Sequence, residues 1–288
     1  SSIASTSPIT PAPSRDPRER SHRRHQHGTD VGVELAMGAQ TRVEPIYEVL
    51  EGWKTSTEGA RTWADAQRYR TSYEQALDAI GSQRKGLPIH ERSSLSVKLS
   101  ALEPRYDLMH EGLVMQRLVP IATDLARRAA TADVGFTIDA EEADRLDLSL
   151  SVFEALARDP ATLSWSGLGI VVQAYGKRAP LVIEWLASLA RTTQRRICVR
   201  LVKGAYWDHE VMVARSAGWS VPVFEERSAT DANFERQTRF VMRNQRWLRP
   251  ALGSHNLRSM AHGIAVAEHL NPFLPALHPN GQRTTDNG

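Results

Sequence analysis

The middle of the chain shows two alternating patterns of hydrophobic residues. One consists of short apolar runs, and the other of longer stretches in which apolar residues recur at the spacing of a helix. The apolar runs are rich in Val, Ile and Leu and cover residues 94–102, 134–140, 168–175, 197–205, 221–225 and 251–256. Runs of this composition, bounded by turn residues, are typical of buried strands. The pattern therefore predicts six strands, with a weaker seventh in PIYEVL near Tyr47.

Between these runs, apolar residues recur at the three-and-four spacing of one helix face. The spacing is most regular over 143–157, and an earlier series over 66–80 is closed by Gly81. Residues 181–190 and 257–270 are further helix candidates. Strand and helix in alternation predict a parallel sheet with helices on its outside.

Polar residues stand near the carboxyl end of nearly every predicted strand, which favours a (βα)8 barrel over an open doubly wound sheet. A barrel gathers such positions at one face, where its active sites lie. No G-x-G-x-x-G follows any strand, and this weakens the dinucleotide-binding alternative. An eighth strand is not visible, so we expect an α/β barrel that is incomplete at its C-terminal end. The polar residues are Lys98, Asp139, Gln173, Arg200, Lys203, Glu225 and His255.

Each of these residues also has an ordinary structural explanation. A single Lys or Gln at a strand end is usually solvated, and a single His is more commonly a structural group than a ligand. Their shared position across several strands favours a functional site. Arg200 and Lys203 stand inside an apolar run, where a buried cation is costly unless it is paired or faces a ligand.

Composition limits the class of protein. The chain has 288 residues, 41% of them hydrophobic, and a formal net charge of +3. The basic excess lies within residues 15–27, so the sequence does not support nucleic-acid binding. We expect a disordered, basic and Pro/Ser-rich tail over 1–40, a barrel over 41–270 and an unstructured C-terminal tail over 271–288.

The single cysteine, Cys198, lies in a predicted strand, which excludes a disulfide framework and suits a reducing compartment. No segment has the apolar length of a membrane-spanning helix or of a signal peptide. His209-Glu210 lacks the second histidine of a zinc helix, so we assign no metal. The expected location is cytoplasmic, or peripheral at the inner face of the membrane.

Several blocks of sequence carry a resemblance to a known family. They are SVKLSALEPRY, FTIDAEEADRLDLSL, GIVVQAYGKRAP, VRLVKGAYWDHE, VPVF with a following TD, and SHN, in this order over residues 47–270. Together they resemble the proline dehydrogenase domain of the bacterial bifunctional proline utilization A (PutA-type) flavoenzymes. The resemblance implies a distorted (βα)8 barrel that binds FAD and oxidises L-proline to Δ1-pyrroline-5-carboxylate, passing electrons to a quinone at the membrane. It also implies a fused or partner pyrroline-5-carboxylate (aldehyde) dehydrogenase domain.

The VRLVKGAYWDHE block is implied to contact both cofactor and substrate. By resemblance, Arg200 approaches the flavin N5 edge, where a cation favours the reduced state. Lys203 and Gly204 line the flavin, and the small Gly204 lets the backbone approach it closely. Tyr206 walls the proline ring, and Trp207 lies toward the adenosine portion.

The other blocks take implied roles in the same way. Lys98 meets the proline carboxylate, and Asp139 is expected as its ion-pair partner beside the cofactor. The Gln173 amide can both donate to and accept from the flavin's pyrimidine edge. Lys98, Asp139, Arg200 and Tyr206 are thus the expected catalytic residues. The remaining implied cofactor contacts are Phe224, Glu225, His255 and Asn256.

The family pattern continues to an eighth strand and a helix whose paired arginines clamp the substrate carboxylate, and nothing like it follows Leu270. We therefore expect a chain truncated before that strand and helix. Besides a FAD-dependent proline dehydrogenase, two alternatives stay open. One is a catalytically impaired fragment without the clamp, and the other is a Schiff-base aldolase that uses Lys98 or Lys203.

Overall fold

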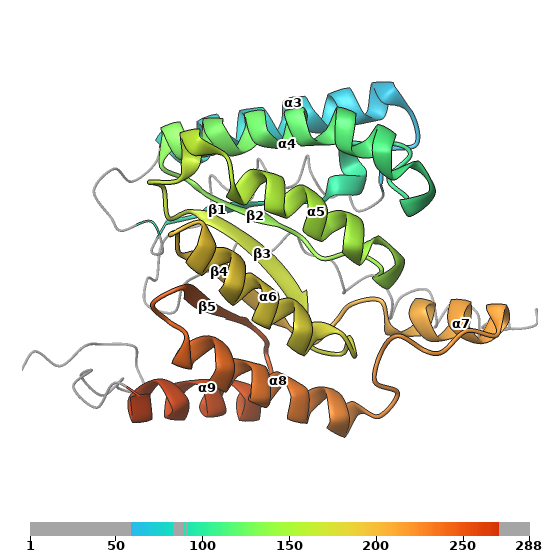
Figure 1. Ribbon diagram of the computed structural model, residues 1–288, viewed down its shortest axis with the longest axis vertical. Helices are drawn as coiled ribbons and strands as arrows, with labels where there is room; N and C mark the ends of the chain where they lie inside the picture. The colour runs from blue at the N-terminus through green and yellow to red at the C-terminus, as the bar shows by residue number, and fades with distance from the viewer. Residues whose placement is uncertain (1–58, 83–88, 90–91, 271–288) are drawn as a thin grey trace, which may run out of the picture. The chain divides into compact units, whose positions relative to one another are not determined.

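The computed structural model describes residues 59–82, 89 and 92–270 (Figure 1). The predicted tails over 1–40 and 271–288, and the weak strand near Tyr47, lie outside the described residues. The expected division of the chain into a barrel and two tails therefore stays a prediction.

The described residues build a parallel sheet whose strands follow one another in chain order, β1-β2-β3-β4-β5 (Figure 1). A doubly wound sheet would reverse direction at a switch point, whereas a barrel wall adds each strand beside the last. The predicted α/β barrel class is confirmed, and the described residues supply five strands of its wall. The strands are β1 (Ser94–Val97), β2 (Gly135–Ile138), β3 (Leu168–Gln173), β4 (Ile197–Val202) and β5 (Leu248–Gly253).

Helices occupy the connections between strands, as the alternating pattern predicted. The long helices are α3 (Trp63–Ser82), α4 (Glu111–Ala132), α5 (Leu146–Ala157), α6 (Ala179–Thr192), α7 (Trp207–Ala217), α8 (Arg227–Arg243) and α9 (Leu257–Leu270). Short 3-10 turns are η2 (Leu99–Ala101), η3 (Leu108–His110), η4 (Ala143–Arg145) and η5 (Pro160–Thr162). In the part of the chain described here, no helix is both long and apolar enough to cross a bilayer.

The prediction of a sheet strand over 221–225 is wrong. Val223 forms one antiparallel bridge with Gly176, and the Phe224 N–H donates to the Tyr175 carbonyl at 2.7 Å. Strand β5 pairs directly with β4, so the segment has no place in the sheet. Its proline also lacks the N–H that a ladder requires. The segment instead lies against the loop that follows β3.

The two faces of the sheet have different characters because successive side chains point to opposite sides. Phe136, Ile138 and Val199 belong to the large core that the strands share with the helices. In Figure 1, α5 and α6 lie in front of the sheet and α4 lies above it. On the opposite face, Ser96 and Thr137 stand side by side in the register. The polar face is the concave interior of a barrel wall.

We expect Phe136→Ala to destabilise the chain by about 3–5 kcal/mol, because it opens a cavity in the helix-facing core. Phe136 is fully buried, with 0% of its side chain exposed. Urea unfolding followed by circular dichroism measures the change. Met109→Ala is the control, since Met109 is 94% exposed, and its effect should stay within about 0.5 kcal/mol. Equal effects of the two substitutions would contradict the described core.

Candidate functional site

Arg200 extends from β4 across the concave face of the sheet. Its Nη2 donates to Ser96 Oγ of β1 at 2.6 Å and lies 3.4 Å from Asp139 Oδ1, just after β2. Only 8% of Arg200 is exposed. The cation that the sequence placed inside an apolar strand is therefore compensated by a carboxylate and a hydroxyl from two other strands.

Lys203, one residue beyond β4, has its own counter-charge. Its Nζ forms an ion pair with Asp231 of α8 and lies 5.9 Å from the centre of the Phe234 ring. The two cations of the β4 segment thus have separate anionic partners. The two charges consequently stay apart, Arg200 on the inner face and Lys203 toward α8.

Gly204 adopts a backbone conformation that only glycine accepts without strain, with φ of +136°. A Cβ added there would lie 2.4 Å from the ring of Tyr175. The sequence had explained Gly204 by close approach to a cofactor. The structure gives an additional reason for glycine, since one face of this residue is covered by Tyr175.

Lys98 and Tyr206 line one polar cleft, of about 470 Å³, beyond the carboxyl ends of β1 and β2. Glu141 and Arg145 line the same cleft. Burial raises the pKa of the Tyr206 hydroxyl, so Tyr206 stays protonated near neutral pH and can donate a hydrogen bond. The cleft is therefore lined by an ammonium and a phenol, both hydrogen-bond donors, together with carboxylates that include Glu141 and Glu142. The ion pair expected between Lys98 and Asp139 stays a prediction.

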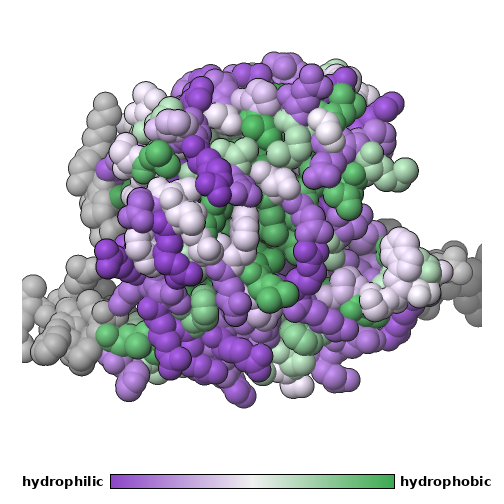
Figure 2. Space-filling model, in the orientation of Figure 1, coloured by the Kyte–Doolittle hydropathy of each residue, from purple (hydrophilic) through white to green (hydrophobic). Residues whose placement is uncertain are grey.

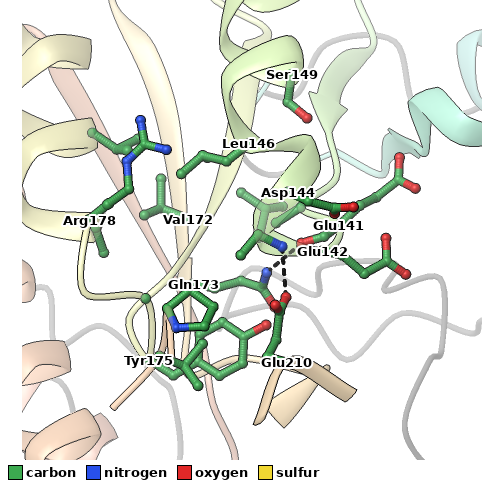
Figure 3. A pocket seen from close by; sticks show the side chains of 18 of the residues that line it. Glu141, Glu142, Asp144, Leu146, Ser149, Val172, Gln173, Tyr175, Arg178 and Glu210 are labelled. Atoms are coloured by element: carbon green, nitrogen blue, oxygen red, sulfur yellow. Dashed lines mark hydrogen bonds between the residues drawn. The ribbon is translucent and has the colours of Figure 1, made fainter. Parts of the chain in front are cut away.

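A second cavity, of about 300 Å³, adjoins this cleft, and apolar side chains of β3, α5, α6 and α7 line much of it. Asp139 also lines it, as do Gln173 and Glu210 (Figure 3). Apolar atoms gather in a hollow at the centre of the face seen in Figure 2. The two cavities share Glu141 and Glu142 as a common wall.

Gln173 ties together the loops on either side of β3. Its Nε2 donates to the carbonyl of Glu141 at 2.9 Å, and its Oε1 accepts from the N–H of Ala205 at 3.0 Å. The resemblance implied a cofactor contact for this amide. The structure shows that the amide also fixes the segments after β2 and β4 relative to each other.

The sequence did not single out Glu141 or Arg145, and Glu210 was considered only as part of a zinc motif that is not there, although each of the three has a defined place in the structure. Glu141 Oε1 accepts from the N–H of Ser100 at 3.0 Å, and its Oε2 pairs with Arg145 Nη1 at 2.9 Å. Burial raises the pKa of both Glu141 and Glu210. For Glu141 and Arg145, the available sequence signal was the polar run DAEEADR, residues 139–145, directly after a buried strand. Nothing in that run identifies which of its carboxylates turns inward.

Trp207 and Glu225, two of the implied cofactor contacts after β4, form hydrogen bonds or ion pairs with other residues of the protein. Trp207 Nε1 donates to the carbonyl of Phe224 at 2.9 Å, which holds the start of α7 against the segment after it. Glu225 is exposed and pairs with Arg215 at 2.6 Å. A purely structural role therefore accounts for Trp207 and Glu225, and their cofactor roles stay predictions.

His255 and Asn256 follow β5 at the start of α9. Asn256 Oδ1 accepts from the N–H of Ser259 at 3.0 Å, as a helix-capping side chain does. His255 is exposed. The structure thus groups Ser96, Asp139 and Arg200 by direct contact. The cofactor roles of His255 and Asn256 stay predictions.

Comparisons with known proteins agree on one family. Residues 40–274 match the family model described as proline dehydrogenase. The chain is 42% identical over 214 residues to the bifunctional protein PutA of Salmonella typhimurium and 45% identical over 245 residues to that of Rhizobium meliloti. These matches cover 74% and 80% of this chain but only 16% and 20% of the relatives.

Solved structures give the same result. A crystal structure of a Bradyrhizobium japonicum proline utilization A mutant superimposes with a TM-score of 0.72 at 43% identity, covering 73% of this chain and 22% of that one. A proline utilization A from Bdellovibrio bacteriovorus, inactivated by N-propargylglycine, gives a TM-score of 0.71 at 28% identity and covers 79% of this chain and 26% of that one. The chain thus spans about a quarter or less of the relatives it matches.

We expect Gly204→Ala to lower stability by more than about 2 kcal/mol, because the methyl group meets Tyr175 in a strained backbone region. Gly112→Ala is the matched control, since nothing lies within 4 Å of a Cβ at that position in α4. It should be neutral or stabilise by up to about 1 kcal/mol. Thermal and urea unfolding of both variants test this, and an unchanged Gly204→Ala protein would refute the tight contact.

Proposed function

Because this chain belongs to the proline dehydrogenase family, we propose that it supplies the proline-oxidising site of an enzyme that converts L-proline to Δ1-pyrroline-5-carboxylate with FAD. The observation that carries the proposal is the gathering of Lys98, Asp139, Gln173 and Arg200 at the carboxyl ends of one parallel sheet. These residues come from four different strands or the segments directly after them. This is the edge at which barrel enzymes hold their substrates.

The chain's residues fit an anionic, planar cofactor on the β4 side of the site. Arg200 and Lys203 supply positive charge there, and the exposed backbone of Gly204 and Ala205 leaves room for close approach. When bound, a flavin supplies the two-electron oxidant that none of the twenty side chains provides. Gln173 and Asn256 would then bind the flavin through the amide donors and acceptors that are not used in their hydrogen bonds within the protein.

The oxidation turns the C5–N single bond of proline into a double bond, so C5 loses a hydrogen with two electrons and the ring amine loses protons. Lys98 would meet the carboxylate of the zwitterion by a charge-assisted hydrogen bond. Tyr206, protonated at neutral pH, would close the same cleft over the ring. Arg200 places a fixed cation near the reacting edge, where it favours the accumulation of negative charge.

The proposal also includes two partners, a pyrroline-5-carboxylate dehydrogenase and a membrane quinone. The relatives named bifunctional protein PutA are much longer than this chain, and a fused or partner pyrroline-5-carboxylate dehydrogenase would consume the product. A membrane quinone would reoxidise the cofactor, with the protein in the cytoplasm or at the inner face of the membrane. The Schiff-base alternative is less well supported for Lys203, since its ion pair with Asp231 favours the non-nucleophilic ammonium.

We expect the full-length protein to be yellow and to oxidise L-proline with an artificial electron acceptor. Lys98→Met should lower kcat/KM by roughly tens- to thousands-fold, because a buried carboxylate would lose a charged partner, while flavin content stays near that of the parent. Steady-state kinetics and flavin absorbance measure the two quantities separately.

Lys177→Met is the control, because Lys177 is exposed in the loop after β3 and its side chain donates to the carbonyl of Val221, between α7 and α8. It should leave both quantities close to those of the parent. Equal loss of flavin and activity in Lys98→Met would make Lys98 structural. A full-length protein that binds flavin but leaves proline unoxidised would overturn the proposed function.

A further inference from the structure

Helix α7 has a small contact with the rest of the protein, although it follows the β4 site segment directly. It extends to the right of the sheet in Figure 1, and its buried residues are Glu210, Val211 and Ala214. Tyr206, which lines the polar cleft with Lys98, is the N-cap residue of this helix. The placement of Tyr206 therefore depends on a small number of contacts made by α7.

Glu210 makes a specific contact at the far side of the site. Its Oε1 accepts a hydrogen bond of 2.7 Å from the backbone N–H of Ala143 (Figure 3). Ala143 is the first residue of η4, which runs into α5, and the N-cap residue Glu142 provides no side-chain cap. The first N–H groups of a helix need acceptors from elsewhere. Glu210 supplies one from a position 67 residues away in the chain.

The surroundings of Glu210 do not favour a negative charge. Glu210 is only 6% exposed, and no ion pair to it occurs among residues 59–82, 89 and 92–270. Burial raises its pKa, and Asp144 and Glu142 add to the rise, whereas the hydrogen bond from Ala143 and the nearby His209 oppose it without reversing it. An ionised carboxylate is therefore disfavoured here, and the useful property is the acceptor oxygen. A glutamine keeps that oxygen without the charge.

We propose that Glu210 is a positioning residue that holds α7, and with it Tyr206, against the segment 139–143. The inference rests on the proposed function for its catalytic consequence, and on the hydrogen bond for its geometry. Gln173 makes a second tie between the same two segments, through Ala205 and Glu141. The hydrogen bond of Glu210 to Ala143 is a further contact, located after Tyr206 in the chain. It therefore fixes the direction of helix α7 relative to the site.

The test compares Glu210→Ala with Glu210→Gln in the full-length protein. In Glu210→Ala we expect amide hydrogen exchange over 207–217 and 143–147 to become about fivefold to tenfold faster, the effect of losing one helix cap. The KM for proline should rise by about tenfold while kcat falls less than about threefold and flavin content is unchanged, as for a lost positioning contact. Glu210→Gln should match the parent in all of these measurements.

Ala143→Pro removes the donor of the same hydrogen bond and tests the contact from its other end. Proline suits the first position of a helix, and Glu142 already has the extended backbone that precedes a proline. It should reproduce the effects of Glu210→Ala, and the two changes together should add nothing further. Asp208→Ala, on the exposed side of the same turn of α7, is the matched control and should change nothing.

Unchanged exchange in Glu210→Ala would overturn the proposal, and so would a Glu210→Gln variant as impaired as Glu210→Ala, since charge would then matter more than the acceptor. The proposed function fails separately, if the parent leaves proline unoxidised. In that case the exchange rates alone still decide whether Glu210 holds α7 in place.

Discussion

The interior of this sheet is organised around one buried cation. Arg200 reaches from β4 past β3 to Ser96 on β1 and Asp139 after β2. A guanidinium with 8% exposure would be strongly destabilising without these partners. The contact requires the strands to curve, because only a concave face brings β1 and β4 within one side-chain length. Curvature, the polar inner face and the location of the site therefore depend on the same interaction.

Arg195 shows that position decides what a buried arginine does. It lies just before β4, at the amino end of the sheet, and donates to the carbonyls of Ala157, Thr162 and Trp165. Burial lowers its pKa to about 10, and its hydrogen bonds all go to parts of the protein's own backbone or to a threonine. Arg200, five residues later, faces a carboxylate at the opposite end. The first arginine joins connecting segments together, whereas the second presents its charge to the site.

The sequence predicted the parallel α/β class and the boundaries of α9, because apolar periodicity reports directly which face of an element is buried. It also placed Lys98, Asp139, Gln173 and Arg200 at the carboxyl ends of strands. It failed over 221–225, where an apolar run packs against a loop instead of joining the sheet. Composition alone cannot separate these two outcomes, since both bury the same residues. Helices α4, α7 and α8 were not predicted individually, and the polar sequence of α8 conceals its buried Phe234.

The contacts that shape the site could not be predicted, because they join side chains to backbone N–H groups in distant loops. Glu141 holds the loop after β1 at Ser100, Gln173 holds the turn after β4 at Ala205, and Glu210 holds the turn after β2 at Ala143. Of these three side chains the sequence pattern pointed only to Gln173, and it identified none of the N–H groups that they bind.

The same bonds also bear on the cofactor role that the family resemblance implies for Gln173. An amide side chain carries two N–H donors and two acceptor lone pairs, and its bonds to Glu141 and Ala205 use one of each. Holding two loops and meeting a ligand edge are therefore compatible roles for this one residue. An amide is the only uncharged side chain with that capacity, which gives a physical reason for glutamine at the end of β3.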